Sequence, residues 1–289
     1  MLKVLVWQVS KDTSFKDKAI KILEQQHNGI EIVGEAVNED IAKVDGGGQY
    51  DVLLVVGARW KMSDVVNNAI QLNLPEEKML GDWIVTIPGF KLEKYRKLQR
   101  SQLSIFAMNC FGGLISNMLA LPFRSPTINM FFTYQEYLRL LRAPRVYMEE
   151  NLVLKKTIFY EPGKYYYPVF TLGNVDIFMN HYPDFDEAKS KWNERKQKIN
   201  WYNLFVTMYT DDEKFLREFN ALPYGKKVCF VSFPSDLDSA WYINPEVDFD
   251  RRDPHFYEVV NNFARGKIFY YDIFDMLLYG KKTPLIDMG

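Results

Sequence analysis

Cysteine and histidine are scarce in this chain. Its 289 residues include two cysteines, Cys110 and Cys229, and three histidines. Two cysteines are too few for the disulfide framework of a small secreted protein, and with three scattered histidines they form no tetrahedral zinc set. We therefore expect two free thiols, a reducing cytoplasmic location and no metal site.

Long apolar runs and an excess of charge are also missing. No stretch approaches the roughly 18 consecutive apolar residues of a transmembrane helix, and the N-terminus lacks the pattern of a secretory signal. The net charge is -1, so the overall charge does not favour nucleic acid as a partner. The 47% hydrophobic content is that of a globular protein with a substantial core.

The glycine motifs that hold nucleotide phosphates are absent from their expected places. The first apolar strand, at residues 3–7, is followed by seven residues without glycine, which excludes the tight turn of a dinucleotide fingerprint. The triplet Gly46-Gly47-Gly48 does not follow a strand, and we interpret it as a flexible connection. The Walker loop and the Gly-x-Ser-x-Gly elbow are missing as well.

The alternation of apolar runs with amphipathic segments predicts an α/β fold with two domains. Residues 1–90 are expected to form a Rossmann-like parallel sheet, whose five consecutive apolar residues at 52–56 indicate a central strand buried on both faces. A charged linker helix at 91–102 leads to a larger α/β domain with a mixed sheet at 103–289. The expected strands of the first domain cover residues 3–7, 30–37, 51–57 and 78–80, and its helices cover residues 15–25 and 62–72.

The second domain is expected to contain six strands among its helices. Two of the strands form a hairpin that turns at Gly173-Asn174, and Asp184 or Asp186 caps the helix that follows. Pro144 and Pro162 bracket a further helix. The expected strands cover residues 103–108, 127–132, 167–172, 175–180, 204–209 and 227–232, and the other helices cover residues 113–121, 134–142, 185–199, 213–219, 256–264 and 273–279.

Polar side chains follow the ends of several of these strands. Asn109 and Cys110 come after the first strand of the second domain, and His181, Asp211 and Asp236 come after three others. Open α/β sheets bind their ligands beyond the carboxyl ends of the strands. We therefore expect these side chains to line one cleft.

Cys110 is the strongest candidate for chemistry in that cleft. It precedes Gly112-Gly113 and the start of a helix, whose dipole would lower the thiol pKa and whose amides could hold an oxyanion. With His181 as the base, this arrangement would suit acyl transfer through a thioester. The alternatives are a small buried cysteine at a tight turn and a histidine that is only a hydrogen-bonded turn residue.

Two further groups could bind an anionic substrate or its counter-ion. Asp236-Leu237-Asp238 has the spacing with which metal-dependent glycosyltransferases hold a divalent ion and a sugar diphosphate, although such pairs are also common in solvated turns. Arg124 could clamp a phosphate or carboxylate, or form an ordinary ion pair.

Several motifs lie between residues 100 and 245: Asn109-Cys110-Phe111-Gly112-Gly113, residues 121–127, His181-Tyr182, residues 187–192, Arg195-Lys196, residues 199–201 and Leu222-Pro223-Tyr224. Together they resemble a bacterial family of unknown function whose members are commonly labelled exopolysaccharide biosynthesis proteins. The resemblance implies a setting, the synthesis of surface polysaccharide, and often a Rossmann-like N-terminal domain. We expect a transferase that moves a glycosyl or acyl group from a sugar nucleotide or acyl donor; the alternative is a non-catalytic sugar- or nucleotide-binding or scaffold protein of that pathway. Cofactor, substrate and oligomeric state are not indicated.

Overall fold

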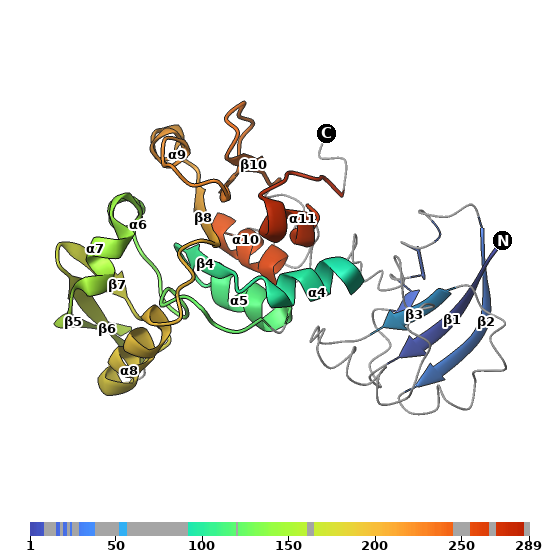
Figure 1. The fold of residues 1–289 in the computed structure, drawn as a ribbon, viewed down its shortest axis with the longest axis horizontal. Coiled ribbons are helices and arrows are strands. Elements are labelled where there is room, and N and C mark those ends of the chain that lie inside the picture. Colours follow the sequence, from blue (N-terminus) through green and yellow to red (C-terminus); the bar gives the residue numbers. More distant parts are fainter. Residues whose placement is uncertain are drawn as a thin grey trace.

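The computed structural model has an α/β fold that contains both parallel and antiparallel sheets (Figure 1). None of the helices in the part of the chain that it describes has the length and apolar content needed to cross a membrane. The residues described are 1–8, 16–17, 20–21, 24, 29–37, 52–56, 92–119, 121–160, 165–244, 255–265 and 270–285.

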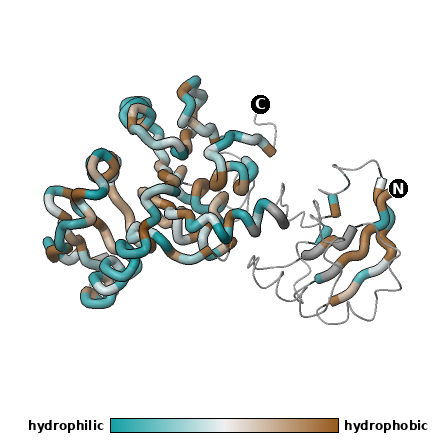
Figure 2. The backbone as a smooth tube through the Cα atoms, viewed as in Figure 1, coloured by the Kyte–Doolittle hydropathy of each residue, from teal (hydrophilic) through white to brown (hydrophobic). Residues whose placement is uncertain are grey.

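The N-terminal residues form a three-stranded parallel sheet of β1 (Leu2–Gln8), β2 (Ile30–Val37) and β3 (Val52–Val56). All three strands were expected, and the apolar character of β1 is visible in brown in Figure 2. The order is β2-β1-β3, so β1 is central among the described strands. The expected central position of the third strand stays a prediction, because the strand expected at 78–80 lies outside the described residues. A continuous apolar run indicates burial on both faces, but it does not determine how many neighbours a strand has.

Part of the expected N-terminal structure falls outside the described residues. This applies to the helix expected at residues 62–72, the strand at 78–80 and the glycine triplet. Within the helix expected at residues 15–25, the described residues are helical.

A four-stranded parallel sheet forms the centre of the rest of the chain, in the order β10-β9-β8-β4. The strands expected near residues 103–108, 204–209 and 227–232 are confirmed. The fourth was not predicted, because it has only three residues and no long apolar run. The strands are β4 (Ser104–Ala107), β8 (Leu204–Thr210), β9 (Lys227–Val231) and β10 (Ala240–Tyr242).

The two faces of this sheet bury different parts of the chain. Successive residues of a strand point to opposite faces, and the core divides accordingly: Ile105 and Ala107 pack on one face, and Phe106 and Met108 on the other. The first face is covered by α4 (Leu92–Arg100), α5 (Phe111–Met118), α10 (Phe256–Ala264) and α11 (Ile273–Tyr279). The second face is covered by α6 (Tyr134–Arg142), α8 (Phe185–Lys196) and α9 (Glu213–Asn220) together with an antiparallel sheet.

Helix α4 is docked on the body of the second region. Lys94 donates to the buried carboxylates of Asp272 (3.1 Å) and Asp275 (2.6 Å) in and before α11. The Tyr95 hydroxyl donates to the carbonyl of Leu119 at the end of α5 (3.0 Å). These contacts tie the charged helix to the core that carries the central sheet.

The antiparallel sheet has the order β5-β6-β7. The predicted hairpin is confirmed: β6 (Tyr165–Leu172) and β7 (Val175–Phe178) pair across a turn in which Gly173 has φ +62°. The strand β5 (Leu152–Tyr160) was missed, because its sequence places two lysines within an exposed edge. The predicted helix between Pro144 and Pro162 is the short α7 (Pro144–Glu149).

Two expectations about the second region are wrong. Residues 127–132 form no strand; Phe131 makes a single bridge to Phe178, and Asn129 has φ +61°, which interrupts extended backbone. The parallel and antiparallel strands form separate sheets rather than one mixed sheet. The hairpin packs its apolar side on the second core cluster instead of extending the ladder of β4.

Candidate functional site

Cys110 and His181 lie in contact at the carboxyl end of the parallel sheet. Cys110 follows β4 and is the N-cap residue of α5, whereas His181 follows β7 in the loop before α8. The Cys110 Sγ lies 3.3 Å from the His181 Nε2, within the range of a sulfur hydrogen bond. Cys110 is partly exposed and His181 is exposed, so small reagents can reach both side chains. The fold therefore brings together two candidate residues that are 71 positions apart.

Both members of this pair are neutral at rest. Burial raises the pKa of the Cys110 thiol, and the Arg265 guanidinium opposes this to a smaller extent. Surrounding protein also desolvates the His181 ring, which lowers its pKa, and Arg265 lowers it further. At neutral pH the pair is thus a thiol beside a neutral imidazole, and the tautomer of the ring decides which of the two atoms donates.

Asn109 holds the turn that carries Cys110. Its Oδ1 accepts from the amide of Phe111 (3.1 Å), and its Nδ2 donates to the Oδ1 of Asn261 in α10 (3.1 Å). The side chain is buried. Asn109 therefore links the β4–α5 turn to α10 and positions the cysteine through the backbone.

Gly112 and Gly113 allow α5 to pack closely. A Cβ on Gly112 would lie 3.3 Å from the Ala107 Cβ and from the Ile105 side chain, and one on Gly113 would lie 3.3 Å from the Ile128 side chain. Close packing is thus a sufficient reason for both glycines. The first amides of a helix lack intrahelical partners, and because Asn109 accepts from the first of them, the next two belong to Gly112 and Gly113.

Asp211 lies at the same edge of the sheet in a group that contains two tyrosines. The Tyr134 hydroxyl donates to the Asp211 Oδ1 (3.3 Å), and its ring contacts Tyr209 edge-on at 6.0 Å between centroids. Burial raises the pKa of Tyr134 to about 12, and Asp211 contributes. Burial also raises the pKa of Tyr209, which further senses Tyr134, Asp211 and Cys110. Both tyrosines are therefore neutral at pH 7, and Tyr209 is the one whose titration Cys110 influences.

Sequence reasoning missed Tyr209, Tyr134 and Arg265. The rule that ligands bind beyond strand ends could have found Tyr209, because it is the penultimate residue of β8. Arg265 follows α10, and only the docking of α10 against α5 brings it near the Cys110–His181 pair. No local pattern in the sequence indicates that position.

The structure does not place Asp238 with Cys110. Asp236 and Asp238 are exposed in the β9–β10 connection. Burial lowers the pKa of Lys227, the first residue of β9, and the Asp238 carboxylate opposes this shift, so Asp238 lies near the amino edge of the sheet. Because β10 runs parallel to β9, the β9–β10 connection must return to the amino edge of the sheet before β10 can begin. Among the described residues, no three His, Cys, Asp or Glu side chains are grouped so that they could bind a metal ion.

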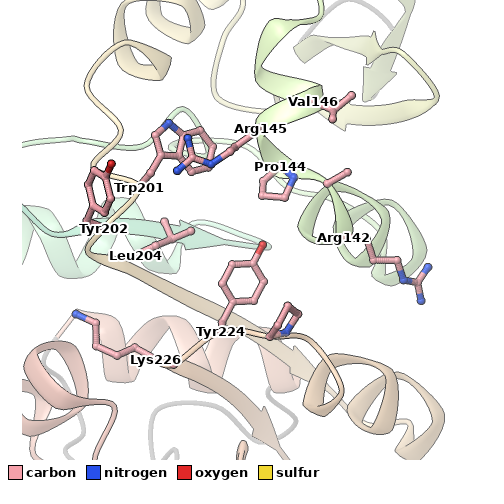
Figure 3. Close-up of a pocket in the computed structure, with 12 residues that line it drawn as sticks. Arg142, Pro144, Arg145, Val146, Trp201, Tyr202, Leu204, Tyr224 and Lys226 are labelled. Carbon is pink, nitrogen blue, oxygen red and sulfur yellow. The ribbon is translucent and has the colours of Figure 1, made fainter.

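A cavity of about 640 Å³ opens at the amino edge (Figure 3). Its wall includes Trp201, with the Arg145 guanidinium stacked 4.7 Å above the ring, and Lys226. Burial lowers the pKa of Lys226 to about 8, and its ammonium donates to the Leu277 carbonyl (3.3 Å) and to Asn203. In this cavity, Arg145 and Lys226 thus already interact with other groups of the protein, and neither Cys110 nor His181 lines the cavity.

Arg124 lies in another cavity, of about 450 Å³, whose lining also excludes Cys110 and His181. The predicted site residues therefore fall into separate groups. Asn109, Cys110, Gly112, Gly113, His181 and Asp211 gather at the carboxyl edge of the sheet, whereas Arg124 and Asp238 lie elsewhere.

Comparison with known proteins places these motifs in a family. DUF1919, a domain of unknown function, matches residues 84–279, which include every element from α4 to α11. The chain belongs to the DUF1919 family. An uncharacterised protein of Haemophilus influenzae is 33% identical over 152 residues, which cover 51% of this chain and 71% of that relative. The expected membership in a family of unknown function is confirmed, and Cys110, His181 and Arg265 all lie within the DUF1919 region.

Proposed function

We propose that this DUF1919 protein is a transferase that moves an acyl group through a thioester on Cys110 during the assembly of bacterial surface polysaccharide. The observation that supports it most directly is the 3.3 Å contact between the Cys110 Sγ and the His181 Nε2. A nucleophile and a base within hydrogen-bond reach are the minimal apparatus of covalent acyl transfer. The polysaccharide setting rests on the resemblance of the motifs between residues 100 and 245.

The proposed reaction has two steps. Cys110 Sγ attacks the acyl carbon of the donor while its proton moves to His181 Nε2, and the imidazolium then protonates the leaving group as its bond to carbon breaks. In the second step a sugar hydroxyl gives its proton to His181 and attacks the thioester, and the proton returns to the departing sulfur. Each tetrahedral oxyanion would lie against the Gly112 and Gly113 amides at the start of α5.

Arg265 suits this chemistry electrostatically. Burial is the larger effect at both residues: it raises the pKa of Cys110 and lowers the pKa of His181. The nearby Arg265 guanidinium stabilises the thiolate and destabilises the imidazolium, so it lowers the pKa of both. An imidazolium with a lowered pKa is a stronger acid and protonates a poor leaving group more readily. The pair therefore works by general-base activation of a neutral thiol rather than as a stable ion pair.

The N-terminal sheet is proposed to be a Rossmann-like domain at residues 1–90, joined through residues 91–102 to the catalytic part at 103–289. The parallel order β2-β1-β3 supports a doubly wound arrangement of the flavodoxin-like order. In this proposal the domain would help to bind the donor, a sugar nucleotide or an acyl carrier, and the glycine-free first turn leaves no dinucleotide fingerprint.

A non-catalytic sugar- or nucleotide-binding or scaffold protein of the same pathway is the second candidate function. The raised pKa of Cys110 favours it, because a resting thiolate would be rare at neutral pH. The packing of Gly112 and Gly113 also accounts for the turn without any catalytic requirement.

Covalent labelling separates the two functions. We expect p-nitrophenyl acetate to give a burst of one nitrophenol per chain and an acetyl group on the Cys110 peptide in mass spectra. Cys110→Ala should abolish both signals, whereas Cys229→Ala, which removes the buried second thiol, should leave them unchanged. Equal labelling of Cys110→Ala and the wild-type protein would refute the nucleophile. A thermal-shift screen with acyl-coenzyme A and sugar nucleotides then identifies the donor class, because a bound donor raises the unfolding midpoint.

A further inference from the structure

A cationic pocket lies between the segment after α5 and the end of α8. Its volume is about 450 Å³, which suits a small ligand. The lining contains four cationic side chains and one carboxylate, so its formal charge is 4 − 1, or +3. The lining residues are Pro122, Phe123, Arg124, Lys191, Glu194, Arg195 and Lys198.

Arg195 is buried in this pocket without a carboxylate partner among the described residues. Arg195 as a whole residue is 9% exposed. One guanidinium nitrogen donates to the Tyr182 hydroxyl (2.6 Å), and the group lies 5.3 Å above the Phe123 ring. A neutral hydroxyl and an aromatic face do not neutralise a buried charge, which normally requires an ion of opposite sign.

Arg124 adds a second incompletely satisfied guanidinium. Its Nε is buried and has no hydrogen-bond partner among the described residues. Buried N–H groups in proteins are nearly always hydrogen-bonded, and those that are not commonly mark a position taken by a ligand or ion. Two guanidinium groups from different segments thus have unused donors in one pocket.

Glu194 does not supply the missing negative charge. Its carboxylate accepts from Lys198 at 2.5 Å and lies 3.5 Å from Lys191, on the exposed side of α8. The two lysines therefore pair with the one acid of the pocket, and neither arginine has a carboxylate partner in the part of the chain that the structure describes. An ordinary solvated charged face would not bury Arg195 or the Arg124 Nε.

We propose that this pocket binds the phosphate group of a small phosphorylated molecule. Two guanidinium groups can donate in parallel to the oxygens of a phosphate, and flanking lysines add charge without demanding one geometry. A phosphate dianion also matches the +3 lining better than a single carboxylate. The site does not depend on the proposed acyl transfer, since neither Cys110 nor His181 lines it.

Calorimetric titration of the full chain tests the proposal with inorganic phosphate, pyrophosphate and glucose 1-phosphate at constant low ionic strength. We expect at least one of them to bind with a Kd below about 1 mM, and the comparison shows whether the ligand is a free phosphate, a diphosphate or a sugar phosphate. Acetate at the same ionic strength should bind at least about tenfold more weakly. Wild-type protein that binds none of the three, or binds acetate equally well, would overturn the assignment.

Substitutions locate the binding in this pocket. Arg124→Gln should weaken it by about tenfold or more, as expected for the loss of charge-assisted hydrogen bonds. Lys189→Gln removes a charge from α8, the helix that carries Arg195, at a position that does not line the pocket. It should change the Kd by less than about twofold. Equal affinities of the two variants would refute the site. We choose Arg124 for the substitution because replacing Arg195 would also remove its hydrogen bond to the Tyr182 hydroxyl. Cys110→Ala should bind phosphate normally, so failure of acyl transfer and failure of this site are distinguishable.

Discussion

Replacement of His181 by glutamine should slow the acylation of Cys110 by about a hundredfold at pH 7, the usual contribution of a general base. Burial keeps the Cys110 pKa above the ordinary 9.0, so less than about 1% of the thiol is ionised at that pH. Attack then depends on transfer of the thiol proton to the imidazole that lies 3.3 Å away. Glutamine retains much of the shape and polarity of the ring but cannot accept this proton effectively.

The pH profile gives the sharper test. Burial lowers the His181 pKa below 6.5, so the wild-type rate should rise as the pH passes this lowered pKa and His181 loses its proton. The rate should then be constant through pH 7 to 8 and increase again as the Cys110 thiol ionises. The His181→Gln rate should lack the first rise and increase about tenfold per pH unit up to the thiol pKa. Stopped-flow detection of nitrophenol, with Cys110→Ala as the background, measures both profiles. Identical profiles for wild type and His181→Gln would contradict general-base activation.

The remaining predictions concern stability. Lys94→Met leaves the buried carboxylate of Asp275 without its 2.6 Å partner and should lower the free energy of unfolding in urea by about 2 kcal/mol, allowing for the partial exposure of the lysine, whereas the exposed Lys97→Met should have little effect. Burial raises the pKa of Asp275, but the hydrogen bond from Lys94 helps to hold it below the ordinary 3.8. The resulting stabilisation should be present above about pH 4 and lost as the pH falls below that value, so the wild-type Tm should fall more steeply in acid than that of Lys94→Met. Gly173→Ala, at φ +62°, should cost about 1 kcal/mol in the same urea assay, whereas Gly225→Ala, whose added Cβ meets no atom within 4 Å, should not; similar costs at both positions would argue against backbone strain.

Local structure followed closely from the sequence where a short segment contains its own signals. The helices α6, α10 and α11 begin and end where their patterns predict. The capping of α8 is equally local: Asp184 accepts from the amides of Asp186 and Glu187 at 2.8 Å. These features depend on neighbours within a few residues, and the sequence contains that information directly.

Strand pairing was predicted less well. The strand β5 has no apolar–polar alternation, because two exposed lysines separate its apolar residues, and the three residues of β10 are recognisable as a strand by their pairing with β9. Conversely, the apolar run at residues 127–132 forms no strand, because the Thr127 hydroxyl accepts the amide of Ala107 and Asn129 turns the chain. A strand forms only where a partner lies beside it, and an apolar pattern does not identify that partner.

The candidate site shows the same division between local and tertiary information. The expectation that Cys110 and His181 face one cleft came from the rule that open α/β sheets bind ligands beyond the carboxyl ends of their strands. The structure places the two side chains in contact, although His181 follows β7 of the antiparallel sheet and not a strand of the parallel sheet. The same rule did not place Asp238, whose connection returns to the opposite edge. The roles of Cys110 and His181 in catalysis stay predictions until the labelling experiment is done.

The sequence by itself determined the α/β class, most helices, the alternation of side chains between two sheet faces and the DUF1919 motifs, because each depends on residue type and short spacing. Only the tertiary structure decided which side chains share a site. It brought Arg265 to the Cys110–His181 pair by docking α10 on α5. It also placed the buried Arg195 in one pocket with Arg124, with no carboxylate partner for Arg195 within the described ranges. Electrostatic interaction depends on distance and burial, and both are set by contacts between segments that are remote in the chain.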